Sequence, residues 1–276
     1  MTLTTRKPSG EPSWPVLLLA GGEKAGKSWA CAQASASPKV GRTLWVSVGE
    51  TDPDAYGAIP GARFEIVEHD NTLTGVAKVL AEIASLPKTD PPTLLVVDSM
   101  TRLWDMVTDQ AQAQANKRGK QGSESIITMD LWNRAKGFWG HMVQSILAHD
   151  GPVLLTARLE PVTVLDERGK PTPLKADKIK TEKNLPYDVD GVIEMPARGV
   201  VFISGVRSVS LQIAERREYP KFTVDGLWDS LGLDRIVRRH VSAPVSVVPE
   251  DHVREVTPFE GDGLGLTNDE TGEVPQ

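Results

Sequence analysis

Residues 17–30 read LLLAGGEKAGKSWA, so four apolar residues lead through a glycine-rich turn to a lysine and a serine. The apolar run WPVLLLA, residues 14–20, is typical of a strand that is covered on both faces. The alanine-rich stretch at residues 27–36 is expected to form a helix. Gly21, Gly26, Lys27 and Ser28 match the spacing G-x-x-x-x-G-K-[ST] between that strand and that helix, which is the context in which the motif binds phosphate.

This turn predicts a cradle for the phosphates of a nucleoside triphosphate. Its glycines let successive backbone N–H groups point inward, and the helix adds the positive end of its dipole. Lys27 is expected to reach the β- and γ-phosphates, and the Ser28 hydroxyl is expected to bind Mg²⁺. The nucleotide-binding residues that we predict in this stretch are Gly21, Gly22, Glu23, Lys24, Ala25, Gly26, Lys27, Ser28 and Trp29.

Two carboxylates follow later predicted strands. Asp98 ends the run TLLVVD, and Glu50 comes just after RTLWVSV. The carboxyl ends of parallel strands meet at one edge of a sheet, where ligands collect. We therefore expect Asp98 to hold Mg²⁺ through water and Glu50 to act as the general base that orients a water. Two alternatives stay open, since Asp98 could cap the following helix and Glu50 could be a solvated loop residue.

The rest of the chain alternates between strand and helix patterns. Apolar residues recur at helical spacing over residues 72–85 and 126–149. A hairpin-like excursion around Gly169 separates two groups of strands. Further strands are predicted at residues 63–68, 151–158, 190–195 and 199–207. This order predicts an α/β fold whose twisted, mostly parallel sheet is flanked by helices and carries antiparallel edge strands.

Length and composition favour one globular domain. The chain has 276 residues, of which 39% are hydrophobic, and this is enough for a buried core. We expect a leader at residues 1–11, an ATPase domain at residues 12–240 and an acidic disordered tail at residues 241–276. The tail carries eight acidic residues and one arginine, so the first 240 residues are close to neutral. Such a tail either only aids solubility or forms an acidic arm that docks on a partner or competes with nucleic acid.

Other signals exclude several classes of protein. Cys31 is the single cysteine, which rules out an internal disulfide framework. No stretch approaches the roughly 20 apolar residues of a membrane span, and the N-terminus lacks the apolar region of a secretory signal. We expect a cytoplasmic protein without a membrane partner.

Four motifs in this order resemble the RecA/RadA-type recombinase ATPase core, and more closely the short phage-encoded RecA-like single-strand annealing proteins. They are the phosphate loop, WVSVGETDPDAY, LLVVDSMTRLWD, and TARLEPVTV followed by KTEKNLPYDVDGVIEM. The resemblance covers roughly residues 14–205. It implies a RecA-like P-loop NTPase core that uses ATP and Mg²⁺, binds single-stranded DNA and forms a homo-oligomeric ring or filament. For a phage-encoded protein, the location would be the cytoplasm of the host cell.

The resemblance also implies roles for individual residues. Glu50 would activate the attacking water, and Asp52 and Tyr56 would lie near the adenine. Thr156 and Arg158 are the candidates for sensing the γ-phosphate, where the family usually has a glutamine. A cation donated across a subunit interface would complete the site, with Lys183 the first choice and Arg207 the second. Lys183 could equally be a solvated lysine at the end of a strand.

In this family two mobile loops bind single-stranded DNA, and two basic segments stand at the corresponding places. Residues 113–125, AQANKRGKQGSES, carry Lys117, Arg118 and Lys120. The segment at residues 165–180 carries Arg168, Lys170 and Lys175. Basic flexible segments neutralise phosphates and give salt-sensitive binding with little sequence preference. Solvated loops with no ligand are the alternative.

Three functions are compatible with the sequence. The first is an ATP-hydrolysing RecA-like protein that binds single-stranded DNA and promotes annealing or recombination. The second is a non-catalytic, nucleotide-gated accessory module of replication or recombination, which would need the phosphate cradle but not Glu50. The third is a small-molecule P-loop kinase with residues 166–180 as its lid.

Overall fold

The computed structural model describes residues 5–119, 125–166 and 168–233. In chain order its elements are β1 (Val16–Gly21), α1 (Lys27–Ser35), β2 (Thr43–Ser47), the 3-10 helix η1 (Pro53–Ala58), β3 (Glu65–Ile66), α2 (Leu73–Ala84), β4 (Leu94–Asp98), α3 (Met100–Arg118), α4 (Met129–Ala148), β5 (Val153–Leu165), β6 (Pro171–Lys180), α5 (Leu185–Asp188), β7 (Gly191–Ala197), β8 (Val200–Val206), β9 (Arg217–Glu218) and α6 (Val224–Ser230).

Nine strands form one sheet in the order β3-β2-β4-β5-β1-β7-β8-β9, and β6 pairs with β5 off this path. The pairs from β3 through to β7 are parallel. β6, β8 and β9 add antiparallel pairs. The predicted α/β fold class, with a mostly parallel sheet and antiparallel edge strands, is confirmed. β1 lies between β5 and β7 and all six of its residues are buried, as its continuous apolar run predicts.

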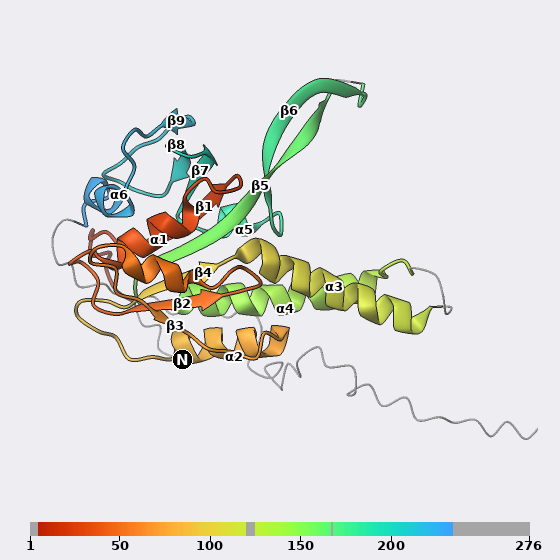
Figure 1. Ribbon diagram of the computed structural model, residues 1–276, viewed down its shortest axis with the longest axis horizontal. Helices are drawn as coiled ribbons and strands as arrows, with labels where there is room; N and C mark the ends of the chain where they lie inside the picture. The colour runs from red at the N-terminus through yellow and green to blue at the C-terminus, as the bar shows by residue number, and fades with distance from the viewer. Residues whose placement is uncertain (1–4, 120–124, 167, 234–276) are drawn as a thin grey trace, which may run out of the picture.

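Helices cover both faces of the sheet, and alternate residues of each strand pack against opposite layers (Figure 1). On β1, Leu17 and Leu19 belong to the apolar cluster that includes residues of α1 and α6. Val16 and Leu18 belong to the cluster that includes residues of α2, α3 and α4. This two-sided burial fixes β1 in the centre of the domain, so the turn that follows it starts from a rigid strand.

Helix α3 continues further than the sequence suggested. Residues 113–125 were expected to form a flexible loop, but α3 extends to Arg118. Val107, Ala111 and Ala115 are buried at four-residue spacing along the helix, and α3 packs against α4. The expectation of a loop is therefore wrong for residues 113–118. Lys120 lies outside the described residues.

Strand β5 also extends beyond its predicted end. Its first five residues are buried in the sheet, and the strand then continues from Arg158 to Leu165 as one arm of an antiparallel pair with β6. This β5–β6 hairpin projects from the body of the domain (Figure 1). The predicted hairpin-like excursion is confirmed, but the segment at residues 165–180 is mostly strand rather than a mobile loop.

The ends of the domain are fixed on the α6 side of the sheet. Trp14 packs edge-on against Trp228 of α6, with ring centroids 5.5 Å apart.

Residues 5–11 of the predicted leader carry no helix or strand. The predicted acidic tail, residues 241–276, lies outside the described residues. None of the helices in the described part of the chain has the length and apolar character that crossing a bilayer requires.

A charged contact attaches α6 to the segment that follows α1. The Lys39 ammonium lies 2.8 Å from Asp225 and 3.0 Å from Asp229, which are one turn apart on α6. Ser37 also donates a hydrogen bond to Asp225. Burial alone would raise the pKa of Asp225, but the hydrogen bonds from Lys39 and Ser37 outweigh it and the net pKa is lowered. For Lys39, burial acts to lower the pKa, and the two aspartates raise it overall.

Replacing Lys39 by methionine should lower the free energy of unfolding by about 1 kcal/mol, because the two aspartates lose their partner and remain partly exposed. A carboxyl group whose pKa is lowered by folding stabilises the fold at pH values above its unfolded pKa, about 3.9. A lysine whose pKa is raised by folding stabilises the fold at pH values below its unfolded pKa, about 10.4. Urea unfolding should therefore show a constant loss between about pH 5 and 9 that shrinks on either side of this range.

The control for this prediction is Lys78→Met, because the Lys78 side chain is 75% exposed and its contact to Glu82 measures 3.9 Å. This variant should unfold within a few tenths of a kcal/mol of the parent, about 0.5 at most. An equal loss in the two variants would contradict a specific role for Lys39.

Candidate functional site

The predicted phosphate loop has the expected strand–turn–helix form. α1 begins at Lys27, its N-cap Gly26 has φ 106°, and no side chain caps the helix. The first N–H groups of a helix have no partner within the helix, so an uncapped N-terminus in a turn is a site for an anion. The left-handed φ of Gly26 is one that side-chain-bearing residues rarely adopt.

Two further glycines are required because β7 passes close to the loop. The Gly22 N–H donates to the Met195 carbonyl over 3.0 Å. A Cβ atom at Gly21 would lie 2.8 Å from that carbonyl oxygen, and one at Gly22 would lie 2.6 Å from the Pro196 oxygen. The glycines therefore allow the backbones of the loop and β7 to touch.

Lys27 lies within the loop that it is expected to serve. Its ammonium donates to the carbonyls of Gly21 and Gly22 over 3.0 and 2.9 Å. Burial lowers the pKa of Lys27, although the charges of Asp98 and Glu50 act in the opposite direction. The ammonium thus lies against the first two glycines of the loop.

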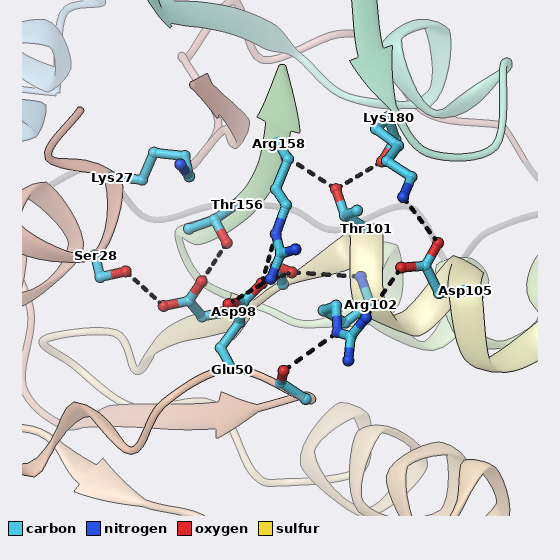
Figure 2. A network of polar contacts seen from close by, with 12 residues as sticks. Lys27, Ser28, Glu50, Asp98, Thr101, Arg102, Asp105, Thr156, Arg158 and Lys180 are labelled. Atoms are coloured by element: carbon cyan, nitrogen blue, oxygen red, sulfur yellow. Dashed lines mark hydrogen bonds and ion pairs between the residues drawn. The ribbon is translucent and has the colours of Figure 1, made fainter. Parts of the chain in front are cut away.

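Asp98 links three parts of the site (Figure 2). Ser28 donates to its Oδ2 over 2.8 Å, and Thr156, on the strand between β1 and β4, donates to its Oδ1. Asp98 is only 6% exposed. Burial raises the pKa of Asp98 against the effect of these two hydroxyls. The alternative that Asp98 caps α3 is wrong, because Ser99 is the N-cap.

These oxygens suit Mg²⁺. The ion is held in nucleotide sites by one or two side-chain oxygens, by water and by the phosphates themselves. Ser28 and Asp98 supply such a pair at hydrogen-bond distance. The described residues contain no cluster of three or more His, Cys, Asp or Glu side chains that could hold a metal ion.

Glu50 lies on the same edge but is held by other groups. The Arg158 guanidinium binds both carboxylate oxygens, with Nη2 2.7 Å from Oε1 and 2.8 Å from Oε2. Ser99 donates to Oε1 over 2.8 Å. Thr156 and Arg158, the two candidate sensors, thus have different partners, Asp98 and Glu50. The alternative of a merely solvated Glu50 is wrong.

A cleft of 1320 Å³ runs along the phosphate loop. The predicted residues that line it are Gly21–Trp29, Glu50, Asp52, Tyr56, Asp98 and Arg158. Asp52 is the N-cap of η1 and accepts a hydrogen bond from the N–H of Asp54. Tyr56 of that helix stacks on Trp45, with ring centroids 6.4 Å apart. The structure therefore brings the loop, both carboxylates and the candidate adenine residues into one cleft.

The residues of the far wall of the cleft were not predicted from the sequence. It is formed by Met195, Arg198, Gly199, Val201, Lys221 and Phe222, which come from β7, β8 and the segment before α6. Their position follows from the parallel pairing of β1 with β7. No local pattern signals that pairing, because the two strands are separated by most of the domain in sequence.

Neither candidate for a cation donated between subunits lines the cleft of its own chain. Lys183 is exposed, and it follows the buried Glu182. Arg207 is 87% exposed in its side chain and lies 3.6 Å from Asp190. Both roles stay predictions, because a residue that acts in the site of a neighbouring subunit need not line the cleft of its own chain.

The candidate DNA-binding residues lie in two places away from the cleft. Lys117 and Arg118 form the last turn of α3, where Arg118 pairs with Asp130 at 2.7 Å. Arg168, Lys170 and Lys175 lie on the β5–β6 hairpin, where Lys175 donates to Thr163 over 2.6 Å. Five of the six predicted cations are therefore located, on a helix end and a hairpin.

The solved structures that are similar to the chain include two at low sequence identity. The RadB recombinase is 17% identical with a TM-score of 0.42, and the match covers 71% of this chain and 82% of that chain. An ATPase of the type III secretion system of pathogenic bacteria is 15% identical with a TM-score of 0.41, covering 65% of this chain and 50% of that chain. A comparison with curated proteins found no match.

The comparison with protein families matches residues 15–220 to the AAA domain. This range contains the phosphate loop, Glu50, Asp98, Thr156 and Arg158. It extends from the first strand of the sheet to the segment just before α6. Because the match spans more than half of the sequence, the chain belongs to the AAA domain family of P-loop ATPases.

Proposed function

We propose that this chain binds ATP with Mg²⁺ and hydrolyses it. The observation that carries the proposal is the direct contact between Ser28, at the start of α1, and the buried carboxylate of Asp98. This contact unites the phosphate loop with an acidic group at the end of β4, two strands away from β1 in the sheet. Bound Mg²⁺·ATP would supply the γ-phosphoryl group and the metal charge that stabilises its transfer.

Individual residues of the chain would then have different roles in ATP hydrolysis. The amides of the loop and the Lys27 ammonium would hold the β- and γ-phosphates, and Asp98 would orient water on the metal. Glu50 would accept the proton of the attacking water. Lys183 of a neighbouring subunit, or Arg207 as second choice, would complete the charge. Such preorganised positive groups contribute most of the rate in phosphoryl transfer.

The proposal extends to single-stranded DNA. The sequence resembles short phage-encoded RecA-like annealing proteins, and the β5–β6 hairpin presents Arg168, Lys170 and Lys175 to solvent. We propose that an oligomer of the chain, a ring or a filament, binds single-stranded DNA through these cations and promotes annealing or recombination. Domain boundaries at residues 12 and 240, a cytoplasmic location and a protein partner for the acidic tail belong to the same proposal.

A non-catalytic module is the second candidate, and one observation favours it. Glu50 is held by Arg158 and Ser99, so protein donors occupy part of its hydrogen-bonding capacity. A chain that only binds nucleotide would need the loop, Ser28 and Asp98 but no free base. The two functions differ in one measurable property, the turnover of ATP.

Replacing Lys27 by alanine should lower ATP turnover about a hundredfold or more, because the transferring phosphoryl group loses a fixed positive charge. The fold should remain intact, which thermal unfolding would show. Lys78→Ala is the matched control, since Lys78 lies on the exposed face of α2. Parent-like turnover in the Lys27 variant would refute the role of the loop.

Replacing Glu50 by glutamine should leave ATP binding intact and lower turnover about a hundredfold, because an amide cannot accept the proton of water. Binding of a fluorescent ATP analogue and steady-state phosphate release separate these effects. If neither the parent nor the variant releases phosphate while both bind the analogue, the non-catalytic module is the correct function.

Binding of labelled oligo-dT, measured by fluorescence anisotropy, should weaken about 10- to 100-fold between about 50 and 200 mM salt, because binding releases counterions. A triple variant that changes Arg168, Lys170 and Lys175 to glutamine should bind more weakly and respond less to salt. Lys78→Gln serves as the control. Binding that ignores both salt and the triple change would contradict the role of the hairpin.

A further inference from the structure

Two tryptophans on neighbouring helices stay partly open to solvent. Trp104 of α3 stacks on Trp132 of α4, with ring centroids 6.5 Å apart and an angle of 25° between the planes. Trp139 of α4 meets Trp104 edge-on at 5.3 Å. Trp139 is buried in the core, whereas Trp104 and Trp132 are half-buried. Packing of the core accounts for Trp139, but it leaves part of the stacked pair in contact with water.

Trp132 lies in an exposed stripe of α4. Met129 stands three residues before it and Lys136 four residues after it, so the three side chains share one face of the helix. Met129 is 73% exposed, and Lys136 is exposed as well. We call Trp104, Met129 and Trp132 the aromatic patch. Helices α3 and α4 run side by side, so the patch spans both of them (Figure 1).

The aromatic patch begins on the side of α3 that contacts the β5–β6 hairpin. Trp104 and Asp105 lie three and four residues after Thr101, so the three residues share one side of the helix. The Thr101 hydroxyl donates to the Lys180 carbonyl over 2.6 Å, and the Asp105 carboxylate lies 3.6 Å from the Lys180 ammonium. Lys180 is the last residue of β6, at the base of the hairpin. Trp104 therefore belongs to the same side of α3 as the contacts to the hairpin base.

The sequence around the patch is rich in positive charge. The described residues between 117 and 136 carry four cations and one acid, namely Lys117, Arg118, Arg134, Lys136 and Asp130. The acid is paired with Arg118 over 2.7 Å. Lysine is depleted in the cores of protein–protein interfaces, which disfavours a protein as the ligand of this surface. Aromatic faces next to cations are typical of sites for single-stranded nucleic acid, where bases stack and phosphates are neutralised.

From these contacts we infer that the aromatic patch binds unpaired nucleobases by stacking, with Trp132 as the principal contact. The inference rests on the proposed function, because it takes single-stranded DNA as the ligand. It adds a second kind of contact, since the cations of the hairpin hold phosphates and the patch holds bases. In a duplex the bases stack on one another, so the patch favours a single strand over a double strand.

Stacking and phosphate contacts respond differently to salt. The stacking of one base on an aromatic side chain contributes about a five- to hundredfold gain in affinity. Phosphate contacts weaken as salt rises, because they depend on the release of counterions, and stacking has no such dependence. The contribution of the bases should therefore persist at a salt concentration where the contribution of the phosphates is small.

A ligand without bases tests the inference. Fluorescence anisotropy would compare labelled oligo-dT with an abasic deoxyribose-phosphate oligomer of the same length, which has the same charge. The parent should bind oligo-dT about five- to hundredfold more tightly than the abasic oligomer. Trp132→Leu keeps an apolar side chain but removes the ring, so it should lose most of this preference. Its affinity for the abasic oligomer should equal that of the parent.

Three further variants separate stacking from charge and from changes in shape. Trp132→Phe keeps an aromatic face and should keep most of the preference for oligo-dT. Lys136→Gln removes a positive charge and should weaken the binding of both ligands by the same factor. Tyr187→Leu is the matched control, because it removes an aromatic ring that is 87% exposed on α5, outside the patch. Thermal unfolding would show that each variant is folded at the temperature of the measurement.

The possible outcomes separate the inference from the proposed function. Equal affinity of the parent for the two ligands, or a preference that Trp132→Leu retains, overturns the inference and leaves the proposed function standing. The same holds if Trp132→Leu weakens the binding of both ligands equally, or if Tyr187→Leu loses as much of the preference. Binding of neither ligand by the parent refutes the DNA part of the proposed function, and the inference falls with it. A preference that is lost in Trp132→Leu and kept in Trp132→Phe supports the inference.

Discussion

The burial of one charge, the Asp98 carboxylate, constrains the rest of this structure. A carboxylate taken from water is costly unless donors surround it, and Ser28 and Thr156 are the donors here. They come from the start of α1 and from β5, so satisfying Asp98 fixes the phosphate-loop helix and the central strands in one relative arrangement. The raised pKa of Asp98 shows that two hydroxyls compensate only part of the desolvation.

The sequence correctly predicts the parts of the site that lie within short, continuous segments of the chain. Gly21–Ser28 and Asp98 each stand at the end of a buried apolar run, and a parallel sheet brings such ends to one edge. The far wall of the cleft could not be found in this way, because Met195 and Phe222 reach it through the pairing of β1 with β7 across most of the chain. The same limit applies to Arg158, whose contact with Glu50 joins positions separated by 108 residues.

Helix α3 illustrates a different limit. Its second half reads as a polar segment with small residues, and that composition is shared by loops and by helices with a narrow buried stripe. Ala111 and Ala115 can be recognised as a packing stripe only when α4 is in place beside them. Tertiary context thus overrides composition, and with it the location of Lys117 and Arg118 changes from a loop to a helix terminus.

The β5–β6 hairpin has a consequence for how the protein behaves at high concentration. A long two-stranded ribbon in solvent invites other chains to add strands along its edges, and proteins avoid this with prolines and charges. This hairpin carries Pro161, Pro171 and Pro173, none of which has an N–H to donate, together with Lys175 and Asp177. Strand addition is disfavoured at these positions. The arm can stay extended without seeding aggregation.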